Sequence, residues 1–199
     1  MSQELILASG SQIRQQLLRN AGLNFAVHSA RVDEEMVRDA LLADAAPARD
    51  IADTLAELKA RKVSDKLPGA LVIGCDQVLS FEKNLLSKPS SPGEARDQLQ
   101  QLRGKRHDLL SAVVICENGQ PVWRHVGVVR MTMRRFSDAY LDGYIERNWD
   151  SIRHSVGAYM LEEEGVRLFS QIDGDYFTVL GLPLLDLLSY LGLRGIIEQ

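Results

Sequence analysis

One carboxylate and three cations occupy positions from which they could act together on a phosphate group. Asp76 follows the apolar run 70–75, which predicts a buried strand that ends at this carboxylate. In open α/β sheets, the carboxyl ends of strands face the crevice where ligands bind. Arg14 follows another predicted strand, Lys59 lies on a predicted helix and Lys88 in a predicted loop. The set suits hydrolysis of a phosphate anhydride, although Asp76 taken alone is more often a capping or salt-bridged residue.

Each of these residues would have a task in that reaction. Attack on the anhydride needs an activated water and neutralisation of charge on the phosphoryl oxygens. Asp76 would act as general base or hold a metal-bound water. Arg14 would grip phosphate through two N–H groups, and Lys59 and Lys88 would act as point charges. The alternatives are a helix-surface salt bridge for Arg14 and ordinary surface positions for the two lysines.

A phosphate-binding loop is predicted near the N-terminus. Residues 5–8 form a short apolar strand, and a tight loop from Ser9 to Ser11 leads into a helix. Ser9, Ser11 and nearby backbone N–H groups would cradle the phosphates, because a helix N-terminus offers free N–H groups to an anion. The segment has neither GxxxxGK[ST] nor GxGxxG, so a P-loop ATPase and a dinucleotide-binding protein are not supported.

The order of the remaining elements indicates an α/β fold that becomes antiparallel towards the C-terminus. Further helices are predicted over 51–62, from Ser91, from Ser137 and after Pro183. Strands over 109–116 and 121–133 are joined at Asn118-Gly119, a hairpin signal. A second hairpin is predicted from strands at 167–172 and 176–180. The polar, acidic segment 31–50 is interpreted as a surface segment or partly mobile loop.

Composition excludes several classes of protein. The 199 residues are 45% hydrophobic and 25% charged, which is ordinary for a globular protein. The formal net charge of −4 disfavours a nucleic acid polymer as partner. The apolar stretches are too short for a signal peptide or a membrane span, so we expect a cytoplasmic protein without a membrane partner. The histidines show no HxxxH or HExxH spacing, which disfavours a zinc hydrolase.

Seven short motifs follow one another along the chain. They are LASGSQIR (7–14), LAELKA (55–60), GCDQV (74–78), SKP (87–89), GAY (157–159), GDY (174–176) and GLPL (181–184). In this order they resemble the Maf family of nucleoside triphosphate pyrophosphatases over nearly the whole chain. The resemblance implies a single Maf-like domain over residues 1–199. Its α/β fold, like that of ITPases, would have a twisted mixed sheet with flanking helices and two lobes around a nucleotide cleft.

The resemblance also implies the reaction and a cofactor. A nucleoside triphosphate, the expected small-molecule partner, would be split into monophosphate and pyrophosphate with a divalent metal, Mg²⁺ or Mn²⁺. Glu34 matches an acidic position of the family and would hold the metal together with Asp76. The alternative for Glu34 is a solvated acidic run with its neighbours at 33 and 35. The oligomeric state stays open, with a homodimer as one alternative.

At three positions the sequence departs from the commonest pattern of the family, and the resemblance implies that these positions select the base of the nucleotide. Ile13 stands where an arginine or tryptophan usually selects the base. Gln77 and Glu162 resemble the branch that hydrolyses 7-methyl-GTP, whereas the branch acting on dTTP and UTP usually has Thr and Gln there. A carboxylate at Glu162 can accept from the N1–H and N2–H groups of guanine. The aromatic contact that would favour a methylated, cationic base is missing at Ile13.

We therefore predict a metal-dependent nucleoside triphosphate pyrophosphatase, a hydrolase of nucleotide metabolism that would remove modified nucleotides such as 7-methyl-GTP. The alternative is a non-catalytic nucleotide-binding regulator of septum formation and cell division arrest, a role linked to the family that the chain resembles. The presence of Asp76, Lys59 and Lys88 favours the enzyme, because a pure binder needs no base aimed at the scissile phosphorus.

Overall fold

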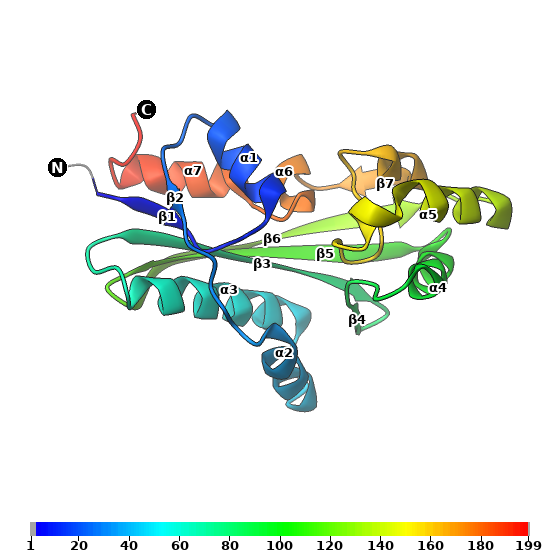
Figure 1. Cartoon of the computed structure of the whole chain (residues 1–199), viewed down its shortest axis with the longest axis horizontal. Helices are drawn as coiled ribbons and strands as arrows, with labels where there is room; N and C mark the ends of the chain where they lie inside the picture. The colour runs from blue at the N-terminus through cyan, green and yellow to red at the C-terminus, as the bar shows by residue number, and fades with distance from the viewer. Residues whose placement is uncertain (1–2, 199) are drawn as a thin grey trace.

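One mixed sheet of seven strands runs through the protein in the computed structural model, which describes residues 3–198 (Figure 1). The strands are β1 Leu5–Leu7, β2 Ala26–Val27, β3 Leu71–Phe81, β4 Asn84–Leu86, β5 Arg106–Glu117, β6 Gln120–Met133 and β7 Phe169–Asp173. Their order is β2-β1-β3-β5-β6-β7, and β4 pairs with β3 off this path. β1 is parallel to β2 and β3, and all other pairs are antiparallel. The predicted α/β fold with a mixed sheet is confirmed.

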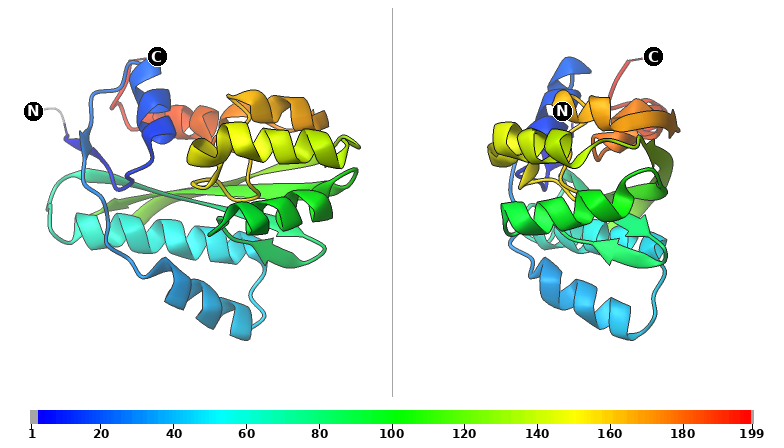
Figure 2. Two further views of the ribbon diagram at one scale, coloured as in Figure 1. Left: turned by 45° about the vertical axis from the view of Figure 1, so that its right-hand side comes forward. Right: turned by 90° about the vertical axis from the view of Figure 1, so that its right-hand side faces the viewer.

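Helices cover both faces of this sheet (Figure 1). They are α1 Gln12–Asn20, α2 Glu34–Ala43, α3 Ala48–Ser64, α4 Pro92–Leu102, α5 Asp138–Ile152, the 3-10 helix η1 Glu164–Leu168, α6 Tyr176–Val179 and α7 Leu184–Leu193. α3 lies along one face, whereas α1 and α7 lie over the other. α2 lies at the periphery below α3 (Figure 2). No helix within residues 3–198 is long and apolar enough to cross a membrane.

Side-chain alternation on β3 divides the core into two parts. Leu71, Ile73 and Cys75 point into a core shared with α1, α4, α5 and α7. Val72 points to the opposite face, into a smaller core with the apolar stripe of α3. This is the period of two that a strand imposes on its side chains. Cys75 is a buried free thiol, as its apolar surroundings predict.

A notch interrupts one edge of β3. β5 pairs with the opposite edge over residues 71–80. On the notched edge, β1 pairs with residues 71–73 and β4 with residues 79–81. Among residues 3–198, no strand pairs with residues 74–78 on that edge. The long strands therefore connect two lobes, one with β1, β2 and α1, the other with β4, α4 and α5 (Figure 1).

The structure confirms the first predicted hairpin. Asn118 and Gly119 join β5 to β6 with φ of 51° and 74°, the positive values that a two-residue type I′ turn requires.

The second predicted hairpin is wrong. Residues 176–179 form α6 rather than a strand, because the carboxylate of Asp175 caps a helix by accepting from the Thr178 N–H at 2.7 Å.

Two further predictions on the elements around the site need correction. Asp76 does not end its strand, since β3 continues to Phe81; what ends near Asp76 is the parallel neighbour β1. For the segment 31–50, the surface alternative is confirmed, since none of its residues is fully buried, whereas the loop alternative is wrong, because the segment contains α2 and the start of α3. Asp33 caps α2 by accepting from the Met36 N–H at 3.1 Å.

Candidate active site

A cleft of about 960 Å³ opens at the notch in the sheet. One wall comes from the β1–α1 loop and the start of α2, the other from residues 87–94 and 154–162. All ten residues selected from the sequence line it: Ser9, Ser11, Ile13, Arg14, Glu34, Lys59, Asp76, Gln77, Lys88 and Glu162. The fold thus collects these positions at one place, while their individual roles stay predictions.

Lys59 bridges two carboxylates in this cleft. Its Nζ lies 2.7 Å from Asp76 Oδ1 and 2.9 Å from Glu34 Oε1. Lys59 and Asp76 are only 8% and 4% exposed, whereas the Glu34 side chain remains partly exposed. Lys59 is therefore not the surface lysine that its sequence context alone allowed. Its charge is already shared by two carboxylates before any phosphate arrives.

The pairing of Lys59 with Asp76 follows from the close approach of α3 to β3. Asp76 is two residues beyond Gly74, so both face α3. A Cβ on Gly74 would lie 2.2 Å from the carbonyl oxygen of Ala56, a contact that only glycine avoids. Lys59 lies one turn after Leu55 on the buried stripe of α3, so its chain reaches along the sheet towards Asp76.

Asp76 has the properties of a general base. Desolvation raises the pKa of its carboxyl group above the ordinary value, although the charges of Lys59 and Arg14 oppose the shift. Its second oxygen, Oδ2, is buried and has no hydrogen-bond partner within residues 3–198. A carboxylate with a raised pKa and an unused acceptor in a cleft is suited to take a proton from a bound water.

Arg14 is anchored by backbone carbonyls. Its Nε donates to the Gly181 oxygen at 2.8 Å, and its Nη1 donates to the Cys75 oxygen at 3.0 Å and to Ser9 Oγ at 3.3 Å. The Cys75 carbonyl lies on the notched edge of β3, where no strand can satisfy it. Arg14 forms no ion pair with a carboxylate of residues 3–198, so the surface salt bridge is excluded. If Arg14 binds phosphate, it must do so through the N–H groups that these contacts leave free.

The predicted phosphate loop leaves donors available. Ser11 is the N-cap of α1, but its side chain makes no capping hydrogen bond. Its backbone N–H donates to Ser9 Oγ at 3.3 Å. The start of α1 therefore keeps N–H groups that an anion can accept from. Lys88 lies across the cleft, exposed and without an ion pair within residues 3–198.

The amide of Gln77 is held in one orientation. Its Nε2 donates to the carbonyl oxygens of Val179 and Thr178 at 2.9 and 3.3 Å, and to Ser111 Oγ at 3.0 Å. The Ser111 hydroxyl donates to the Thr178 carbonyl at 2.7 Å, so its oxygen accepts from Gln77. Since the two carbonyls can only accept, the Gln77 nitrogen must face them. Gln77 therefore keeps its Oε1, an acceptor, for a ligand.

Ile13 and Glu162 line the same cleft. Ile13 is half-buried against the larger core. Glu162 is exposed, and partial desolvation raises the pKa of its carboxyl group. The side chains of Glu162 and Gln77 thus both offer acceptor oxygens, whereas Ile13 offers only apolar surface.

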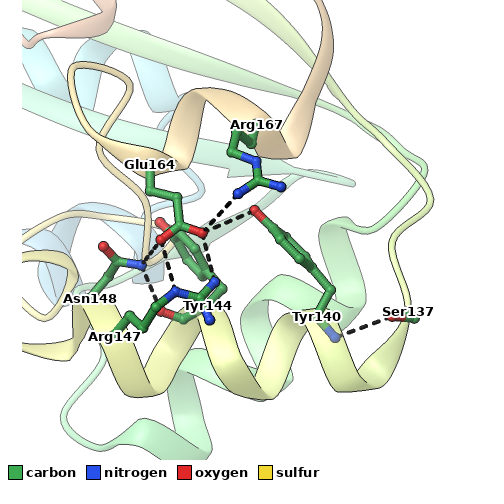
Figure 3. Close-up of polar contacts among 7 residues, drawn as sticks. All are labelled: Ser137, Tyr140, Tyr144, Arg147, Asn148, Glu164 and Arg167. Carbon is green, nitrogen blue, oxygen red and sulfur yellow. Dashed lines mark hydrogen bonds and ion pairs between the residues drawn. The ribbon is translucent and has the colours of Figure 1, made fainter.

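Glu164 holds the segment that carries Glu162 against α5 (Figure 3). Arg147 donates to both oxygens of Glu164, at 2.7 and 3.2 Å, and Asn148 Nδ2 donates at 2.9 Å. Arg167 adds a positive charge 3.6 Å away. Hydrogen bonds from Arg147 and Asn148 lower the pKa of Glu164 to about 2. Glu164 therefore stays ionised at neutral pH and keeps the two elements together.

The cleft offers oxygen donors for a divalent metal. No group of three or more His, Cys, Asp and Glu side chains that could hold an ion occurs within residues 3–198. Asp76 and Glu34 provide two carboxylates, one of them with the unpartnered oxygen Oδ2. Mg²⁺ is often held by one or two carboxylates together with substrate phosphates and water. The two residues fit an ion that the substrate helps to bind, and Lys59 would share their oxygens with it.

Arg38 and Tyr159 are among the lining residues of the cleft that sequence reasoning did not select. Arg38 is half-buried on α2, four residues after Glu34. That spacing could have placed it on the same helix face. Tyr159 belongs to the GAY motif and is buried, with its hydroxyl 2.8 Å from His107 Nε2. No local pattern predicts this contact, because it joins distant parts of the chain.

The fold and the cleft define an α/β protein with a charged site between two lobes. The chain belongs to the Maf family, because residues 4–193 match the family described as "Maf-like protein".

Several curated relatives are similar over almost their full length. A nucleoside triphosphate pyrophosphatase of Roseobacter denitrificans is 69% identical over 98% of both chains. One of Ruegeria pomeroyi is 67% identical over 100% of both. A 7-methyl-GTP pyrophosphatase of Brucella abortus is 49% identical over 96% of both.

Proposed function

We propose that this protein is a nucleoside triphosphate pyrophosphatase that releases a nucleoside monophosphate and pyrophosphate, and that it acts in the cytoplasm. The observation that carries the proposal is Asp76, a buried carboxylate with a raised pKa and an unpartnered oxygen in the cleft. The names of the relatives from Roseobacter denitrificans and Ruegeria pomeroyi support the same activity.

In the proposed reaction, Asp76 orients a water through Oδ2 and takes its proton. The water oxygen forms a bond to the α-phosphorus, and the bond from that phosphorus to the oxygen leading to the β-phosphate breaks. The electron pair of the broken bond leaves with pyrophosphate. Lys59 fixes Asp76 and adds positive charge beside the reacting group, while the N-terminus of α1 and Lys88 hold phosphate oxygens. Asp76 and Glu34 would hold a divalent ion, whose charge would help to neutralise the phosphates.

For the base, we propose guanine-type nucleotides, including 7-methyl-GTP, as preferred substrates. Gln77 Oε1 and the Glu162 carboxylate offer acceptors, which match the N1–H and N2–H donors of guanine. Uracil and thymine present one N–H between two carbonyls, and those carbonyls would oppose a carboxylate. The name of the Brucella abortus relative supports this preference.

The test is pyrophosphate release from GTP, 7-methyl-GTP, dTTP and UTP, each with Mg²⁺ and with Mn²⁺. We expect release from all four and the highest kcat/KM with the guanine nucleotides. Nucleotide binding without any pyrophosphate release would favour the non-catalytic regulator instead. A higher kcat/KM for dTTP and UTP would contradict only the proposed base preference.

A further inference from the structure

The cations of the cleft divide into two kinds. Arg14 is anchored by carbonyls, and Lys59 is shared by two carboxylates. Arg38 and Lys88 also line the cleft, but within residues 3–198 their side chains make neither a hydrogen bond nor an ion pair. A bound polyanion can therefore use Arg38 and Lys88 without breaking a contact that already exists.

Arg38 shares a helix face with a residue that demonstrably points into the cleft. Glu34 begins α2 and reaches Lys59 at 2.9 Å. Arg38 follows four residues later, so the two side chains lie one above the other on the helix. Glu34 pairs with Lys59, and its carboxylate and the Arg38 guanidinium form no ion pair within 4.0 Å. α2 has no fully buried residue, and it packs against the smaller core through the partly buried Val37 and Leu41 (Figure 2). Val37 and Leu41 make the apolar contacts of this helix, whereas Arg38 lines the cleft.

A triphosphate would add negative charge to a cleft whose carboxylates already outnumber its Lys and Arg side chains. Five carboxylates line it, those of Glu34, Glu35, Asp76, Glu94 and Glu162, against four Lys and Arg side chains. Two of the four cations are already engaged. Phosphate oxygens entering this site would meet an excess of like charge unless an unengaged cation faced them.

We propose that Arg38 is a phosphate-binding residue that holds the pyrophosphate part of the nucleotide, an assignment that rests on the proposed function. Arg38 lies one helical turn beyond Glu34 and hence away from the phosphorus next to Asp76. The residues proposed to read the base lie on β3 and on the segment around Glu162, so the α2 wall is left for the phosphate tail. The guanidinium of Arg38 can donate two parallel hydrogen bonds to phosphate oxygens.

Direct binding of inorganic pyrophosphate and of GMP, measured by calorimetry with the full chain, tests this role without requiring turnover. Arg38→Gln should raise the Kd for pyrophosphate about tenfold, the effect of losing a charged hydrogen bond, and leave the Kd for GMP unchanged. Arg38→Lys should recover part of the affinity, because it keeps the charge. The matched control is Arg134→Gln, since Arg134 is exposed, lies outside the cleft and has no side-chain partner within residues 3–198.

The proposal is overturned if Arg38→Gln binds pyrophosphate as tightly as Arg134→Gln does, if it loses GMP affinity to the same extent, or if the wild-type protein does not bind pyrophosphate. An Arg38→Lys variant as weak as Arg38→Gln would also contradict it. A failure of the proposed hydrolysis can be distinguished from a failure of the proposed role of Arg38. Absence of nucleotide hydrolysis, with pyrophosphate binding still dependent on Arg38, would overturn the reaction and leave this binding site.

Discussion

Replacing Asp76 by Asn tests the proposed base with little disturbance of its surroundings. Asn has nearly the same volume, and its side-chain oxygen can still accept from Lys59 Nζ, which lies 2.7 Å from Asp76 Oδ1. The substitution removes the charge and the basicity. Loss of a general base typically costs about 100- to 10,000-fold in rate. We expect kcat/KM for pyrophosphate release to fall by this factor, which corresponds to about 2.7–5.4 kcal/mol of transition-state stabilisation.

The pH dependence gives a second measurement of the same role. Burial raises the pKa of Asp76, and only the ionised form can accept a proton. The kcat/KM of the wild-type protein should therefore rise with pH through this raised pKa and then level off. The residual rate of Asp76→Asn should lack that rise, because no group titrates at this position.

The thermal stability of the Asp76→Asn protein should not fall together with its rate of pyrophosphate release. The folded state disfavours the ionised form of Asp76, so the stabilising effect of its raised pKa is present at low pH and is lost as pH rises through that value. At neutral pH the Asn variant avoids this cost, and Lys59 keeps Glu34 as its partner. We expect a Tm no lower than that of the wild type.

The matched control for Asp76→Asn is Asp142→Asn, which removes an exposed carboxylate that pairs with Arg96 at 2.7 Å on the surface. This control should keep the wild-type rate. If a folded Asp76→Asn protein released pyrophosphate within about threefold of the wild-type rate, the general-base assignment, which predicts at least about 100-fold, would be refuted.

Three further substitutions test the proposed base contact of Glu162, the ion pairs of Glu164 and the packing of α3 on β3. Glu162→Gln should lower the ratio of kcat/KM for GTP over UTP by about tenfold, the effect of a polar mismatch that a bound base would bury; an unchanged ratio would show that Glu162 does not read the base. Glu164→Gln should destabilise the fold at pH 7 by about 1–2 kcal/mol after allowance for solvent screening. Because the pKa of Glu164 is lowered to about 2, urea denaturation should show this difference closing as pH falls from about 4.5 towards 2, and a gap independent of pH would contradict the ion-pair argument. Gly74→Ala would place a Cβ 2.2 Å from the Ala56 carbonyl oxygen, so thermal melting should reveal a loss of about 1–3 kcal/mol, and an unchanged Tm would mean that α3 can move away without cost.

The sequence by itself determined the features that depend on neighbouring residues. The Asn118-Gly119 turn follows from the tolerance of these two residue types for positive φ. α3 follows from the apolar stripe with Ile51 and Leu55. The residues of the site could be selected because their types suit phosphate chemistry and their motifs recur in one order. In the structure, all ten selected residues line the same cleft.

Only the tertiary structure decided what these side chains contact. The spacing of Lys59 and Asp76 along the chain does not predict that α3 packs on β3 closely enough to join them at 2.7 Å. Nor does it predict that Arg14 reaches the carbonyls of Cys75 and Gly181. The first contact depends on the close packing of α3 on the face of β3, and the contact with Cys75 depends on the early end of β1, which leaves an edge of β3 open. Strand length and pairing are set by long-range packing energies, and a local pattern carries little information about them.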